Sequence, residues 1–142
     1  MAWITPKVNW IGRSDENNVY EGDKFNYTDF NRIKGNLEHL HEISKILYPE
    51  FTIRKINDKY VTDDLYADEI NDITFNLKVI NSRTVKLKLS ALPTYRENGP
   101  TMDYRYLNTV ENTTLEIYNN LIGAISNRRM FTWNFGTRGD SL

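Results

Sequence analysis

Cysteine is absent from this chain of 142 residues, which excludes both a disulfide framework and thiolate chemistry. No apolar run approaches the roughly 20 residues that a membrane-spanning helix needs, so we expect no membrane span. The N-terminus lacks a basic region followed by an apolar core, so we predict no signal peptide and expect synthesis in the cytoplasm. Acidic and basic residues are mixed, and the formal net charge is -1. That balance gives no electrostatic footprint for nucleic acid, and we expect none as a partner.

Catalytic and metal-binding motifs are missing as well. The chain has no glycine-rich phosphate loop, no HExxH and no Gly-x-Ser-x-Gly. Its only histidines, His39 and His41, are two residues apart on a predicted helix, where side chains point about 200° apart and cannot chelate one metal ion. The carboxylates of residues 63–69 cluster where the N-terminus of a helix favours negative charge. We therefore predict that the protein is not an enzyme and has no catalytic residues, metal site or cofactor.

What the sequence does contain is a helical module that occurs three times. Each copy has an apolar residue, an asparagine, and a second apolar residue two positions further on. The copies are Phe30-Asn31-x-Ile33, Ile70-Asn71-x-Ile73 and Leu107-Asn108-x-Val110. Internal repeats of this kind decide the architecture of a domain. A second asparagine follows five residues later in the first two copies, and Thr113 takes its place in the third.

The repeated module predicts a mainly α fold with a three-helix core at residues 26–127. Apolar residues at helical spacing place the helices at about 27–47, 66–82 and 103–127. Asn26 and Asp29 have the spacing of a capping box at the first helix start. Thr101 or Asp103 can cap the third helix. The equivalent asparagines near the helix starts are expected to bond the loop or arm that leads in.

Strand signals are few. Residues 84–90 alternate apolar and charged side chains with a period of two, which favours a half-buried strand over a continuation of the second helix through Leu87. Residues 51–56 fit either a short strand or a packed loop. The fold therefore has room for a short β-strand or hairpin beside the helices.

Both ends of the chain are rich in aromatic residues. Residues 1–25 are predicted to form an extended arm, with an exposed loop at 12–23, and Trp3 and Trp10 pack either on this domain's own helices or on a neighbouring subunit. Residues 128–142 are predicted to form an extended tail in which alternation places three aromatics on one face. The candidate interface residues are Trp3, Trp10, Phe131, Trp133 and Phe135.

Several blocks of the sequence carry a resemblance to a known class of proteins. The blocks are Trp-x-x-Pro-Lys-x-x-Trp at 3–10, Phe-Asn-Tyr-x-Asp-Phe-Asn-Arg-Ile-x-x-Asn at 25–36, Asp-Tyr-x-Tyr-Leu-Asn-x-Val-Glu-Asn at 103–112 and Phe-Gly-Thr at 135–137. Together they resemble small repeat-containing structural proteins of bacteriophage and prophage tails or baseplates from Gram-positive hosts. Thr109 departs from that pattern, where a basic residue is usual, and residues 48–66 match nothing in it.

The resemblance implies a virion component without ligand-binding residues that could be transferred. The expected function is that of a tail or baseplate subunit or adaptor, with other copies of itself or other tail, baseplate or receptor-binding proteins as partners. The alternatives are a small module that binds a glycan or protein of the host surface, and a cytosolic regulatory helical protein. The aromatic ends, rather than the repeat, are where the sequence places function.

Overall fold

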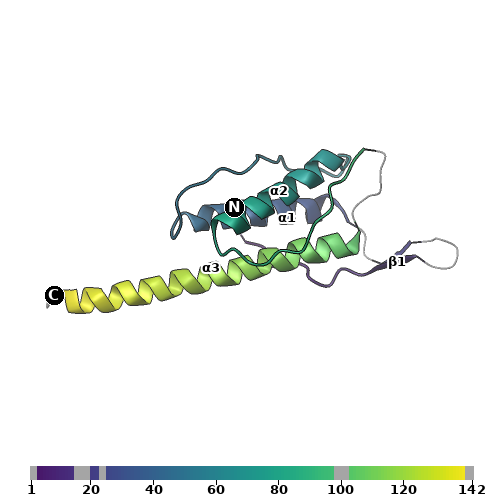
Figure 1. The fold of residues 1–142 in the computed structure, drawn as a ribbon. Coiled ribbons are helices and arrows are strands. Elements are labelled where there is room, and N and C mark those ends of the chain that lie inside the picture. Colours follow the sequence, from purple (N-terminus) through teal and green to yellow (C-terminus); the bar gives the residue numbers. More distant parts are fainter. Residues whose placement is uncertain (1–2, 15–19, 23–24, 98–102, 140–142) are drawn as a thin grey trace.

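A computed structural model describes residues 3–14, 20–22, 25–97 and 103–139, with the backbone alone for 13–14, 20–22 and 128–139. The elements are β1 (Gly12–Ser14), β2 (Tyr20–Gly22), α1 (Tyr27–Ser44), α2 (Ala67–Arg83) and α3 (Tyr104–Gly139). The prediction of a mainly α fold with three packed helices is confirmed (Figure 1). No helix within the described ranges is both long enough and apolar enough to span a membrane.

Helices α1 and α3 begin at residues whose side chains cap them. At α1 the Asn26 side chain accepts hydrogen bonds from Thr28 and Asp29, while Asp29 accepts from the Asn26 N–H, so the capping box is present. At α3 the Asp103 carboxylate accepts from the N–H groups of Arg105 and Tyr106. Each cap satisfies backbone donors that have no partner within the helix.

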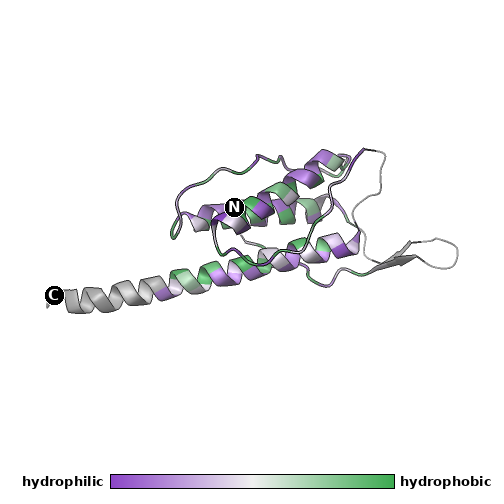
Figure 2. Ribbon diagram, in the orientation of Figure 1, coloured by the Kyte–Doolittle hydropathy of each residue, from purple (hydrophilic) through white to green (hydrophobic). Residues whose placement is uncertain are grey.

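The core lies between the three helices, which bury equivalent stripes. Figure 2 shows hydrophobic positions alternating with hydrophilic ones along each helix, as amphipathic helices require. All six apolar positions of the repeated module are buried: Phe30, Ile33, Ile70, Ile73, Leu107 and Val110. Leu37, Leu77, Ile117 and Leu121 continue the stripes and are also fully buried.

The helices run parallel, so all three N-termini lie at one end of the bundle (Figure 1). Arg32 in the second turn of α1 contacts Glu111 early in α3, and Thr74 of α2 contacts Tyr106 at the start of α3. Parallel neighbours need long connections. Extended segments therefore return between the helices to the end from which the next helix starts.

Three of the sequence-based predictions are wrong in detail. Residues 84–90 form no strand, although Val85, Leu87 and Leu89 are half-buried while the lysines between them are exposed. The period of two reflects which side chains are buried, but the backbone of Leu87 bonds to the side chain of Asn81 rather than to a neighbouring strand. The loop predicted at 12–23 contains an antiparallel hairpin, in which Gly12 pairs with Gly22.

The third error concerns the tail. Residues 128–139 continue α3 instead of forming an extended strand. No proline interrupts 104–139, and Gly123, within α3, has open space around it. Alternation over five residues was too short a signal to outweigh an uninterrupted helix. The side chains of Phe131, Trp133 and Phe135 lie outside the described residues.

Candidate functional site

The repeated asparagines bind the backbone of the returning segments. Asn31 on α1 donates to the Lys59 carbonyl at 2.8 Å and accepts from the Lys59 N–H at 2.7 Å. Asn71 on α2 makes the same pair with Tyr95, at 2.8 and 2.9 Å. Asn108 on α3 does so with Trp10, at 2.9 and 2.7 Å. We call such a pair of hydrogen bonds between one asparagine and one backbone residue an asparagine clamp.

The second asparagine of the module forms a clamp as well. Asn36 binds Ile4 at 2.7 and 3.0 Å, and Asn76 binds Arg54 at 2.8 Å in both directions. Each segment thus lies between two helices, bound by the first asparagine of one and the second asparagine of the other. Segment 3–11 runs between α1 and α3, and segment 51–60 between α1 and α2.

Segment 85–95 departs from this rule. In the other two segments the second clamp comes from the helix that follows the segment in the chain. For segment 85–95 that helix is α3, where Thr113 stands in place of the second asparagine. Asn81, five residues beyond Asn76 on α2, binds Leu87 instead, at 2.8 Å in both directions. Lys86, the residue before the clamp, has a φ of 54°, in the left-handed region that a non-glycine residue seldom adopts.

Segment 3–11 is further held by a buried charged cluster. Glu111 on α3 is 1% exposed and accepts from the Lys7 N–H at 3.1 Å and from the Trp10 indole. Arg32 on α1 donates to both Glu111 oxygens, at 2.9 and 3.0 Å, and to Asp29 at 2.8 Å. Burial by itself would lower the pKa of Arg32, but the hydrogen bonds and charges of these two carboxylates outweigh it and raise the pKa.

The candidate interface residues Trp3 and Trp10 therefore pack on this chain's own helices. Trp10 is 3% exposed, with the Lys7 ammonium 4.4 Å from its ring centroid. Trp3 stacks on Tyr118 of α3 at 3.8 Å, with His39 of α1 beside both rings. The sequence left open whether these tryptophans pack on the domain's own helices or on a neighbouring subunit, and the structure shows the first.

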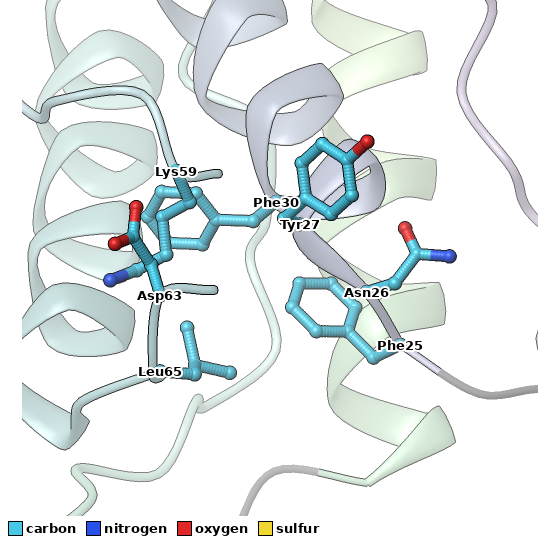
Figure 3. Close-up of a pocket in the computed structure, with 7 residues that line it drawn as sticks. All are labelled: Phe25, Asn26, Tyr27, Phe30, Lys59, Asp63 and Leu65. Atoms are coloured by element: carbon cyan, nitrogen blue, oxygen red, sulfur yellow. The ribbon is translucent and has the colours of Figure 1, made fainter. Parts of the chain in front are cut away.

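A shallow pocket lies at the N-terminal end of the bundle. Figure 3 shows Phe25, Asn26 and Tyr27 on one side, Lys59, Asp63 and Leu65 on the other, and Phe30 between them. The ammonium of Lys59 is occupied, because it donates to the Asp64 carbonyl and pairs with Glu69, each at 2.6 Å. The pocket thus has a mixed lining, in which aromatic rings and Leu65 stand beside an amide and a carboxylate.

The polar side chains of the described residues are occupied by contacts within the chain. In the parts of the chain that the structure describes, no group of three or more potential metal ligands comes together, and no buried side-chain polar atom lacks a hydrogen-bond partner. Tyr106 lies in the core at the start of α3. Its burial raises the pKa of the phenol, whose hydroxyl bonds Thr74 and the Ile70 carbonyl.

Sequence reasoning missed Glu111, Arg32, Lys59 and Asn81. Glu111 carried a signal, since a carboxylate follows Val110 inside an apolar stripe and a buried acid needs a cation. The other three became recognisable only when the returning segments were placed.

Comparison with protein families, with curated proteins and with solved structures gives no match.

Proposed function

We propose that the protein is a non-enzymatic structural protein of a virion, a subunit or adaptor of a bacteriophage tail or baseplate. The sequence blocks described above resemble such proteins. Buried polar groups of the described residues serve internal contacts, with the asparagine clamps and the Glu111 cluster fixing the returning segments. Such a module supplies a rigid frame.

The observation that carries the proposal is the length of α3. This helix has 36 residues, against 18 in α1 and 17 in α2, and it projects beyond the bundle (Figure 1). The last of its residues in the hydrophobic core cluster is Leu121. A helix gains most of its stability from packing, and isolated helices of about 12–15 residues are marginal in water. The projecting turns are therefore suited to contacts with another protein of the assembly.

The test is whether the chain is incorporated into particles. Particles would be purified from a host expressing an epitope-tagged chain and separated into heads and tails, and each fraction analysed by mass spectrometry. We expect the chain in the tail or baseplate fraction at a fixed ratio to other tail proteins. Its absence from purified particles would contradict the proposal. Specific binding of the isolated chain to host cells, without incorporation, would favour the host-surface module instead.

A further inference from the structure

The loop beside the pocket exposes large apolar side chains. Tyr60 is 69% exposed, Val61 78%, Tyr66 52% and Leu65 40%. Tyr27 lies across the pocket from Leu65 and is 38% exposed (Figure 3). Large apolar side chains exposed beside a hollow are typical of a protein-binding surface. We call these five residues, with the pocket, the aromatic end.

The aromatic end is negatively charged. Residues 57–69 contain five acidic residues and one lysine. That lysine, Lys59, is 8% exposed and already paired with Glu69, so it offers no charge to a partner. Asp63, Asp64 and Asp68 remain exposed around the patch. A complementary partner is therefore aromatic and basic.

The chain itself contains a segment of this composition. Residues 126–138 include three arginines, no acidic residue, and Phe131, Trp133 and Phe135. Within one molecule the two surfaces cannot meet, because the aromatic end lies at the helix N-termini and α3 projects from the opposite end (Figure 1). We infer that the projecting end of α3 in one copy docks on the aromatic end of the next copy. This inference rests on the proposed structural function, and it names the partner.

A contact of this kind is head-to-tail. It joins two different surfaces, so an open assembly of any length keeps one free surface of each kind at its two ends until a ring closes. Both surfaces carry charge, so association weakens as salt rises.

A charge swap tests the contact on the full-length chain. One variant carries Asp64→Lys, the other Arg128→Glu with Arg129→Glu. By light scattering coupled to gel filtration, the unmodified chain is expected to show a mass above 16.7 kDa that grows with concentration and falls in high salt. Each variant alone is expected to stay at the monomer mass. An equimolar mixture is expected to regain the larger species, because the new lysine meets the new glutamates.

Two further variants control for folding and for charge alone. Leu65→Ser removes apolar lining and is expected to abolish association with an unchanged circular dichroism spectrum. Glu42→Lys makes the same charge change on an exposed residue at the other end of α1, and is expected to associate like the unmodified chain. A monomeric unmodified chain, or folded variants whose mixture stays monomeric, would overturn the inference.

The outcomes separate this inference from the proposed function. A chain present in particles but without charge-swap rescue retains the function and loses the head-to-tail contact. Rescue by a chain that never enters particles retains the contact and removes the function.

Discussion

An asparagine side chain carries one acceptor and two donors on a planar amide, so it can pair with a backbone N–H and C=O as a neighbouring strand would. Six residues do this here: Asn31, Asn36, Asn71, Asn76, Asn81 and Asn108. Each stands on a helix and each backbone partner is in an extended segment. The clamps thereby supply hydrogen bonds that the segments would otherwise lack.

Removing a clamp is expected to destabilise the fold. Asn31→Ala or Asn71→Ala leaves one N–H and one C=O without their partner, which should lower the free energy of unfolding by about 1–3 kcal/mol. Asn57 is exposed, and Asn57→Ala should change it by less than about 0.5 kcal/mol. Urea titration of the three variants measures the difference. Equal and small effects would show that the clamps contribute little.

The buried phenol of Tyr106 gives a dependence on pH. Burial raises its pKa in the folded state, so above about pH 10 the unfolded chain loses this proton while the folded chain keeps it. Stability must then fall as the pH rises through that range, because the unfolded state binds fewer protons. Tyr106→Phe removes this dependence but costs about 1 kcal/mol at pH 7 through its lost hydrogen bonds.

Urea unfolding of both proteins at pH 7 and pH 11 checks the expectation. The unmodified chain should be the more stable at pH 7, and the gap should shrink by about 1 kcal/mol at pH 11. Tyr60→Phe, at a tyrosine that is 69% exposed, serves as the control. The difference in stability between this variant and the unmodified chain should be the same at pH 7 and pH 11. A constant difference between the Tyr106 variant and the unmodified chain would refute the argument.

At the scale of elements, each returning segment makes backbone hydrogen bonds to asparagine side chains where a strand would make them to a neighbouring strand. Segments 3–11, 51–60 and 85–95 are extended, yet none has a ladder partner among the described residues. Their order comes from clamps on the flanking helices and from side chains that reach the core. Segment 85–95 differs in taking both clamps from α2.

That difference predicts local opening. In Asn81→Ala the Leu87 amide loses its acceptor, so its hydrogen exchange should speed up about tenfold or more, while the Tyr95 amide keeps its protection. Asn71→Ala should do the reverse. Amide exchange followed by NMR distinguishes the two sites. Acceleration of both amides by either variant would mean that the segment opens as one unit.

Sequence periodicity was sufficient for α1, α2 and the part of α3 that packs in the core, because each of them keeps one apolar stripe, but it did not predict that α3 continues through 128–139. It could not identify the partners of the asparagines, since those partners lie 22 to 98 residues away except at Asn81. The strand predicted at 84–90 shows the same limit. Alternation reports which side chains are buried in an extended chain, and it does not report what pairs with the backbone.

At the scale of the whole molecule, segment 3–11 contributes contacts that join α1 to α3. Its Trp10 and Ile4 occupy clamps from α3 and α1, and its Trp3 stacks on Tyr118. Without it the Glu111 carboxylate would keep Arg32 but lose the Lys7 amide and the Trp10 indole. The first and last helices are therefore joined through the segment that comes first in the chain.

A chain lacking residues 1–11 is accordingly expected to melt at a lower temperature and to bind the missing segment in trans. A synthetic peptide of residues 2–12 should raise the melting temperature progressively with concentration, because a ligand that binds the folded state alone stabilises it by mass action. A Trp10→Ala peptide should fail, since it loses the buried ring and the bond to Glu111. An Asn9→Ala peptide, changed at an exposed residue, should act like the original. If no peptide shifts the melting temperature, the three helices form a complete fold without segment 3–11. Trp3 and Trp10 would then be available to contact a neighbouring subunit.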